Sequence, residues 1–193
     1  MKSSSFKSLN NIIKLVMAIK KIIIEPNKIL RQKSLPVNKI GKDEQRLMDD
    51  MLETMYDAKG IGLAAIQIGV PKRIIVMDIS KNDEKNNPMY FVNPLIKNKI
   101  PETSTYEEGC LSVPNFFAEV DRPKKCDVEY LDYNGEKKIL KAEGLLSTCI
   151  QHEMDHLEGI LFIDYLSKLK KQLLLKNYQN KKIDQIELLF SNV

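Results

Sequence analysis

The stretch QHEMDHLEG contains the only two histidines of the chain, His152 and His156. Residues four apart lie on the same side of a helix with Cβ atoms about 5–6 Å apart, so both imidazoles can reach one metal ion. Leu145 and Cys149 continue the same spacing toward the N-terminus, which predicts a helix that ends near Gly159. The chain is therefore expected to fold around a helix with one metal-binding face.

Glu153 completes the motif H-E-x-x-H, in which two imidazole nitrogens bind a metal and the carboxylate takes a proton from water. The motif is short, and two unrelated histidines at this spacing are the alternative. A catalytic site of this type has three protein ligands, so a thiolate or a carboxylate must supply the third. Downstream, Asp164 is followed mostly by Lys, Leu and Asn. Upstream, Cys110 lies in the turn-like segment YEEGCLSVP, where a side chain can be aimed at a site.

Two further helices are predicted on either side of the central part of the chain. The segment 43–60 has apolar side chains at helical spacing, acids at the start and Gly60 after the end, which is typical of an amphipathic helix. Residues 164–182 predict a final helix coated with lysines. Residues 18–37 predict a short extended segment followed by a turn and a loop around Pro26 and Pro36.

Strand signals fill the region between these helices. Residues 72–80 and 89–96 are rich in β-branched and aromatic side chains and flank the polar loop KNDEKNNP. In residues 127–144, the pair Asn134-Gly135 lies between two alternating segments and predicts a β-hairpin. Strands followed by a helical pattern indicate the α+β class.

Length and charge limit the domain organisation. A chain of 193 residues suits one domain, expected over residues 17–193. Residues 1–16 are predicted to be an N-terminal extension, which could be a loosely ordered arm, an organelle transit peptide, or sequence upstream of a start at Met17. The segments 1–33 and 165–193 are basic and the middle is acidic. Lys-rich ends can contact polyanions such as ribosomal RNA, although a solvated lysine-rich surface is the favoured explanation.

The cysteines and the hydropathy pattern bear on the compartment. Three cysteines at wide spacing argue against a disulfide framework and for a reducing compartment. Cys126 and Cys149 are interpreted as small buried apolar groups. No apolar run approaches the length of a membrane span, so we expect no membrane partner.

Three separated segments, GIGLAAIQ, EGCLS and QHEMDHLEG, resemble the signature motifs of the peptide deformylases in the same order and at similar separations. The resemblance extends from about Ala18 to the C-terminal helix. It implies a metal site of Cys110, His152 and His156. It also implies antiparallel strands packed around the metal-binding helix, with a C-terminal helix.

The resemblance implies a reaction, which is removal of the formyl group from N-formylmethionyl chains to give formate and a free N-terminal methionine. Glu153 is then the general base that later delivers a proton to the leaving amine. The backbone N–H of Leu111 and the side-chain amide of Gln67 are the expected oxyanion donors.

The predicted substrate contacts have two parts. Gly60 and Gly62 lack Cβ atoms and would let an extended peptide pair with this edge, as an added strand does. The first side chain of the substrate would meet the residues that the family implies, which are Ile61, Tyr106, Leu145, Thr148 and Cys149. The Thr148 hydroxyl departs from the aliphatic residue common in the family. Bacterial members of the family often have an arginine near Phe117, where this chain has an aromatic pair.

The resemblance also implies supporting groups and a cofactor. Glu108 and Arg122 are predicted to form an ion pair beneath Cys110. One divalent ion is expected, Fe²⁺ in cells, with Zn²⁺, Ni²⁺ or Co²⁺ suited to the same ligands. The basic C-terminal helix suggests contact with the ribosome. The expected location is the cytoplasm, or an organelle of bacterial origin if residues 1–16 are a transit peptide.

Two other functions stay open on the sequence. An H-E-x-x-H protease would cleave internal peptide bonds without needing a formyl group. A metal-stabilised module that binds ribosomes or RNA would need no turnover, so replacing Glu153 with alanine would leave its function intact.

Overall fold

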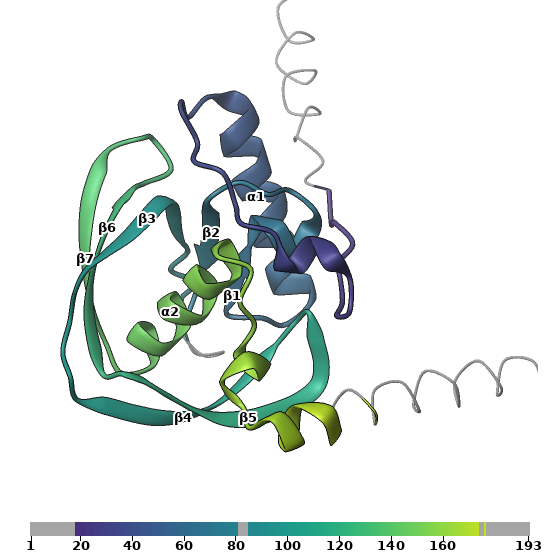
Figure 1. Ribbon diagram of the computed structural model, residues 1–193. Coiled ribbons are helices and arrows are strands. Elements are labelled where there is room, and N and C mark those ends of the chain that lie inside the picture. Colours follow the sequence, from purple (N-terminus) through teal and green to yellow (C-terminus); the bar gives the residue numbers. More distant parts are fainter. Residues whose placement is uncertain (1–17, 81–84, 174–175, 177–193) are drawn as a thin grey trace, which may run out of the picture.

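The computed structural model describes residues 18–80, 85–173 and 176 (Figure 1). The elements are, in order, η1 (Lys28–Arg31), α1 (Lys42–Asp57), β1 (Gly62–Ala64), η2 (Ala65–Ile68), β2 (Ile74–Met77), β3 (Met89–Lys99), β4 (Thr103–Cys110), β5 (Val113–Pro123), β6 (Lys125–Leu131), β7 (Lys137–Glu143), α2 (Leu145–Leu157) and η3 (Phe162–Tyr165). The predicted extension at residues 1–16 lies outside the described part of the chain.

The strands form two antiparallel sheets that enclose α2. Five strands pair in the order β1-β2-β3-β6-β7, and β4 and β5 pair separately. Figure 1 shows the long strands curving around α2, with β4 and β5 passing across one end of it. The predicted α+β class, with antiparallel strands around a central helix, is confirmed.

The composition of strand β2 reflects the presence of a helix on each face of the larger sheet. Its four residues are all buried. Ile75 and Met77 belong to the core cluster that includes Ile150 of α2, whereas Ile74 and Val76 belong to the cluster that includes three methionines of α1. Successive side chains of a strand point to opposite faces, so a continuous apolar run is needed when both faces are covered.

Helix α1 confirms the amphipathic helix that the sequence predicts before Gly60. The Glu44 carboxylate accepts a hydrogen bond from the Gly41 N–H at 3.1 Å, which caps the helix. Its apolar stripe is fully buried at Met48, Met51 and Met55. The helix ends at Asp57 because Lys59 adopts a left-handed φ of 56°.

The predicted hairpin is present as β6 and β7, although its loop is longer than two residues. Strand β6 ends at Leu131 and β7 begins at Lys137. The Asp132 carboxylate accepts hydrogen bonds from the N–H groups of Asn134 and Glu136, both at 2.9 Å. This side-chain capping stabilises a five-residue turn, with Gly135 in the left-handed region.

The hairpin of β4 and β5 was not expected from the sequence. The less exposed residues of β4 are Ser104, Tyr106, Glu108 and Cys110, so neither face of the strand is a continuous apolar row that would reveal it. Cys110 is the last residue of β4 and pairs with Val113 after a register shift. The segment predicted to be turn-like is therefore a strand end next to a two-residue turn.

The C-terminal helix is described only at its start, where residues 168–173 are helical. The rest of the predicted helix, apart from residue 176, lies outside the described residues. Among the described helices, none combines the length and apolar character needed to cross a membrane.

Candidate active site

Helix α2 brings the two histidines and the glutamate of the motif into the interior. His152, Glu153 and His156 have exposed fractions of 7%, 4% and 0%. The imidazole rings of the two histidines lie 5.0 Å apart between centroids. The predicted helical spacing therefore gives one buried face with both rings close together.

Cys110 is the third group at this position. Its Sγ lies 3.3 Å from Nε2 of His156, and the ligand atoms of Cys110, His152 and His156 all lie within 4.8 Å of one another. One thiolate and two imidazoles within this distance suit a single tetrahedral ion with one position open for water. The predicted ligand set converges in space and fits a divalent metal.

The charges around the histidines favour a cation at the same place. Burial alone would lower the pKa of His152, but the Cys110 sulfur and the Glu108 carboxylate outweigh burial and raise this pKa to about 10. The pKa of His156 is well below its usual value because the ring is buried and faces other positive groups. A neutral imidazole at this position is the form that binds metal.

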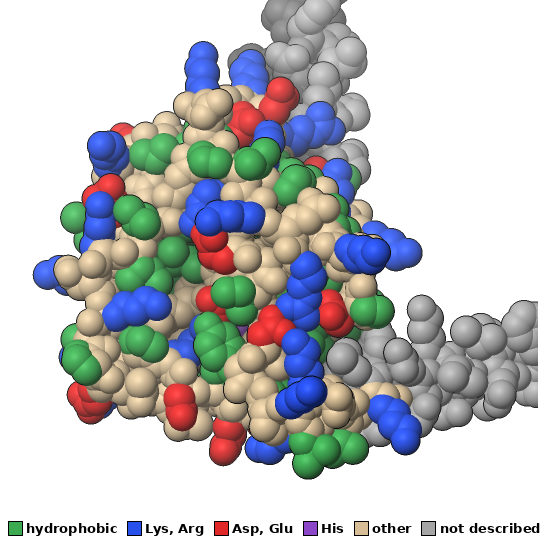
Figure 2. Space-filling model, viewed as in Figure 1, with side chains coloured by type: hydrophobic (Ala, Val, Ile, Leu, Met, Phe, Trp, Pro, Cys, Tyr) green, Lys and Arg blue, Asp and Glu red, His purple; other side chains and the backbone are tan. Residues whose placement is uncertain are grey.

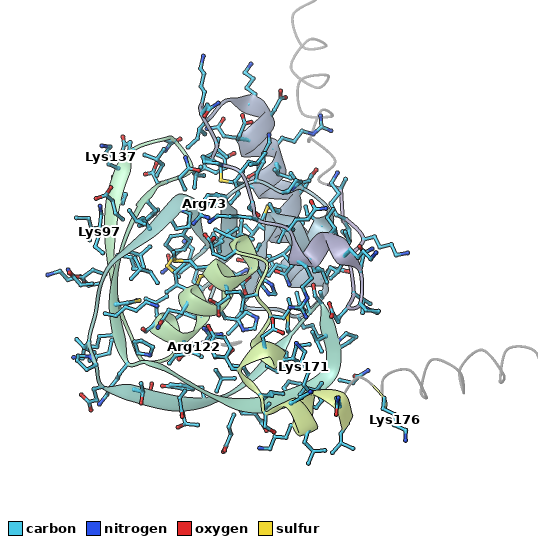
Figure 3. The ribbon with its side chains drawn as sticks, viewed as in Figure 1. Arg73, Lys97, Arg122, Lys137, Lys171 and Lys176 are labelled. Atoms are coloured by element: carbon cyan, nitrogen blue, oxygen red, sulfur yellow. The ribbon has the colours of Figure 1, made fainter. Side chains whose placement is uncertain are left out.

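The predicted ion pair of Glu108 and Arg122 is present and buried. Arg122 donates from Nε and Nη2 to the two carboxylate oxygens at 2.5 and 3.0 Å. Oε2 of Glu108 also lies 2.8 Å from Nδ1 of His152. Figure 3 shows Arg122 beside α2, and a carboxylate held in this way fixes the orientation of a ligating imidazole.

Two members of this network were not predicted. Arg122 Nη1 donates to Asp155 at 2.7 Å, and the Tyr165 hydroxyl donates to the same carboxylate oxygen at 2.9 Å. Asp155 lies inside the sequence motif, three residues after His152, and the same Arg122 side chain contacts both Asp155 and the Glu108 carboxylate next to His152. Its place inside the motif is the one sequence feature that could have indicated a role for Asp155. Its partner Arg122, on β5, is identified only from the fold.

Glu153 is the one buried carboxylate of this group without a charged partner of its own. Burial raises its pKa to about 7. Among the described residues, its Oε2 atom has no hydrogen-bond partner. A Cβ atom added at Gly62 would overlap the Glu153 carboxylate, so the glycine makes room for this side chain. The carboxylate is poised to gain and lose a proton near neutral pH.

The orientation of the Gln67 side chain is fixed at both ends. Its Oε1 accepts a hydrogen bond from the Ala64 N–H at 2.8 Å. Its Nε2 lies 3.2 Å from the Ser112 hydroxyl and 3.6 Å from the Cys110 sulfur. The amide donor therefore points toward the metal position. Ser112, which is fully buried, was not singled out from the sequence, although it belongs to the motif EGCLS.

The predicted site residues gather around one cavity of about 450 Å³. All of them except the fully buried His156 line it, namely Gly60, Ile61, Gly62, Gln67, Tyr106, Cys110, Leu111, Leu145, Thr148, Cys149, His152 and Glu153. This volume is that of an ordinary small-ligand site. Burial raises the pKa of Cys149 well above its usual value, so its thiol stays neutral in the cavity wall.

Hydrolysis of an amide with the help of a metal ion is the chemistry that these groups can perform together. A metal position, a proton-transfer group and an amide donor meet at a cavity large enough for the end of a peptide. Fold and site thus define a metal-dependent amide hydrolase.

Comparison with known proteins identifies the family of amide hydrolases to which the chain belongs. A family model described as polypeptide deformylase matches residues 19–172. A peptide deformylase of Pelagibacter ubique is 68% identical over 88% of this chain and 99% of its own length, and one of Rhizobium meliloti is 56% identical over 84% and 93%. A crystal structure of peptide deformylase from Ehrlichia chaffeensis is 40% identical, with a TM-score of 0.83, covering 88% of this chain and 99% of that one.

The chain therefore belongs to the peptide deformylase family. It is an enzyme that removes the N-formyl group from N-formylmethionyl nascent polypeptides, releasing formate and a free N-terminal methionine. The family is metal-dependent. A structure of the Ehrlichia chaffeensis enzyme in complex with actinonin is 42% identical to this chain, with a TM-score of 0.81 over 86% of this chain and 98% of that one.

Proposed function

We propose that Cys110, His152 and His156 bind the catalytic metal ion, which is Fe²⁺ in the cell. The support is the convergence of their ligand atoms within 4.8 Å. Thiolate and imidazole donors also suit Zn²⁺, Ni²⁺ and Co²⁺. When bound, the ion supplies Lewis-acid activation of water and of the formyl carbonyl.

The observation that carries the catalytic proposal is the buried Glu153 carboxylate, whose Oε2 lacks a partner among the described residues. Glu153 accepts a proton from the attacking water and delivers it to the nitrogen of the leaving amine. Gln67 Nε2 and the Leu111 backbone N–H donate to the oxygen of the formyl group as it gains negative charge. Proton transfer is thus assigned to Glu153 on α2, and charge stabilisation to Gln67 and Leu111 in the other two sequence motifs.

The substrate is proposed to lie along β1, which forms an edge of the larger sheet. Gly60, Ile61 and Gly62 line the cavity next to this edge and would pair with the extended peptide. The side chain of the N-terminal residue would enter among Tyr106, Leu145, Thr148 and Cys149.

Replacing Glu153 with glutamine tests the catalytic proposal. Formate release from a formyl-Met tripeptide should fall by a factor of about 10²–10⁴, since a positioned proton-transfer group is lost. Bound metal, measured by elemental analysis, should stay at the level of the unmodified enzyme. The matched control is Glu143→Gln, which changes an exposed carboxylate at the end of β7. Full activity in the Glu153 variant would assign the base to another residue.

Anaerobic purification followed by elemental analysis tests the metal. Iron in proportion to activity is the expected result. Zinc alone in a fully active preparation would reject Fe²⁺ as the native ion.

The basic C-terminal helix is proposed to contact the ribosome. The face in Figure 2 carries Lys and Arg side chains interspersed with Asp and Glu, and among the described residues it shows no purely basic patch that would bind RNA. The proposal is therefore supported by the many lysines of the C-terminal segment in the sequence. Lys168→Glu with Lys170→Glu should weaken cosedimentation with ribosomes, because the contact is with polyanionic RNA. Unchanged cosedimentation would count against this contact.

We further propose that residues 17–193 are the catalytic domain and that the enzyme acts in the cytoplasm. A reducing compartment keeps the thiolate ligand available, and Cys110, Cys126 and Cys149 are all free. Deletion of residues 2–16 should leave formate release unchanged, and fractionation of the source cells should place the enzyme with cytoplasmic proteins. Cleavage of these residues on entry to an organelle would reject the cytoplasmic location.

A further inference from the structure

The hydroxyl group of Thr148 has no role in the mechanism described above, although it lies in the wall of the cavity. The residue is 5% exposed and lines the cavity. Among the described residues, its Oγ1 atom has no hydrogen-bond partner. A threonine in a helix commonly bonds back to the carbonyl of the preceding turn. Here the Gly144 carbonyl accepts the Thr148 backbone N–H at 3.0 Å, and Oγ1 makes no such bond.

Among the described residues, no group is hydrogen-bonded to the Thr148 hydroxyl, and this includes the Tyr106 hydroxyl, which comes near Gly144 at the start of α2. Ile61 and Leu145 are aliphatic, and the Cys149 thiol is directed to the Ile61 carbonyl at 3.9 Å. A buried hydroxyl that makes no hydrogen bond is costly, so a ligand with an acceptor at this point gains affinity. The thioether sulfur of methionine is a weak acceptor and satisfies the hydroxyl poorly.

Oxidation of methionine produces the acceptor that is missing. A sulfoxide keeps the length of the side chain and adds one strongly accepting oxygen on the sulfur. We propose that this cavity also takes the methionine sulfoxide side chain, with the Thr148 hydroxyl donating to the sulfoxide oxygen. The enzyme would then deformylate chains that begin with N-formylmethionine sulfoxide. This inference rests on the proposed entry of the first side chain beside Thr148.

The reaction itself is unchanged for this substrate. Water adds its oxygen to the formyl carbon, the bond from that carbon to nitrogen breaks, and the amine receives the proton. The sulfur–oxygen bond is neither formed nor broken. Because the sulfoxide sulfur is chiral and the hydroxyl is fixed on α2, one epimer should be preferred.

The experiment compares tripeptides that differ only in the first side chain. Formyl-Met-Ala-Ser, formyl-norleucine-Ala-Ser and each epimer of the formyl-methionine sulfoxide peptide are assayed for formate release by kcat/KM. Norleucine has the shape of methionine and no acceptor. Enzyme variants are Thr148→Val, which has the same shape without the hydroxyl, and Thr148→Ser, which retains it. The readout is the ratio of sulfoxide to norleucine within each enzyme, so a general loss of activity cancels.

The unmodified enzyme should hydrolyse one sulfoxide epimer with a kcat/KM within about tenfold of the norleucine peptide, and Thr148→Val should lower this ratio about tenfold or more. Thr148→Ser should retain most of it. An equal ratio in the valine variant, or hydrolysis of neither epimer by the unmodified enzyme, would overturn the inference. The comparison of epimers in the unmodified enzyme decides the question even if the valine variant does not fold. Absence of formate from formyl-Met-Ala-Ser would instead contradict the proposed function.

Discussion

Two buried carboxylates near the metal position have opposite protonation behaviour because their neighbours differ. Burial raises the pKa of both Glu108 and Glu153, but hydrogen bonds from His152 and Arg122 outweigh it at Glu108, whose pKa is lowered. Glu153 has no such compensation, and its pKa is raised to about 7. Glu108 stays charged and holds the His152 imidazole, while Glu153 can exchange a proton.

Replacing Glu108 with glutamine should weaken metal binding. The variant loses the charge that orients His152 and leaves Arg122 buried with less compensation, which should lower metal affinity by a factor of about 10–100. The measurement is competition with a chromophoric chelator. Glu119→Gln, an exposed change on β5, is the matched control. Equal affinities in both variants would show that Glu108 does not position the ligand.

Replacing Gly62 with alanine should impair catalysis more than metal binding. A methyl group there overlaps the Glu153 carboxylate and displaces it, and a displacement of about 1 Å can cost a factor of about 10² in rate. Formate release and bound metal are measured on the same preparation. In Gly41→Ala, the added Cβ would lie an ordinary 3.6 Å from Glu44, so that variant serves as the control. Undiminished turnover would mean that Glu153 has room to move.

At the scale of elements, α1 holds the start of the described chain through one buried carboxylate. Asp50 accepts a hydrogen bond from the Ala18 N–H at 2.8 Å and pairs with Lys20 at 2.9 Å. Burial opposes ionisation of Asp50, but these partners outweigh it and lower the pKa. The extended segment that crosses the helix therefore depends on a charge.

The stability of this attachment should depend on pH. Because folding lowers the pKa of Asp50, its ionised form stabilises the folded protein above about pH 4, the usual aspartate value. This contribution disappears as the pH falls through the lower value of the folded state. Asp50→Asn should reduce the free energy of unfolding by about 1–3 kcal/mol at pH 7 and by little in acid. Urea denaturation across pH measures the difference, with the exposed Asp57→Asn as control. If Asp50→Asn lowers the free energy of unfolding equally in acid, the loss would arise from altered packing and not from the charge of Asp50.

The elements differ in how much of them the sequence predicted, for physical reasons. Helix α2, helix α1 and the hairpin of β6 and β7 carry local signals, namely apolar spacing and an Asn-Gly turn. Strands β4 and β5 lack such signals, because β4 is mostly polar and β5 contains prolines, an exposed Phe117 and a buried Arg122, so neither strand shows a simple alternation of apolar and polar residues. For the same reason, the sequence predicts a turn-like segment at Cys110, although the residue ends a strand. The three sequence motifs nevertheless predict which residues gather around Cys110.

At the scale of the molecule, the metal position joins parts of the chain that are otherwise separate. Cys110 belongs to the two-stranded sheet and the histidines belong to the helix enclosed by the larger sheet. A metal ion bound by these three residues would therefore cross-link two units of the fold.

Removal of the metal should lower the thermal stability of the whole enzyme. A ligand at about 100 times its dissociation constant stabilises the folded state by about 2.7 kcal/mol. For a chain of this size this corresponds to a decrease in Tm of roughly 5–10 °C on chelation. Thermal denaturation with and without chelator measures it, and adding Ni²⁺ or Co²⁺ should restore the original Tm. Cys110→Ala should be insensitive to chelator. Equal sensitivity in that variant would place the stabilising ion elsewhere.

The edge strand β1 is only three residues long, from Gly62 to Ala64. A peptide paired with so short an edge can form few main-chain hydrogen bonds, and every amino-acid sequence offers those same groups. Beyond the first side chain of the substrate, so short an edge would discriminate little between different polypeptide sequences. A brief strand is thus suited to generality, since a single enzyme of this kind can serve the whole set of proteins that a cell begins to make.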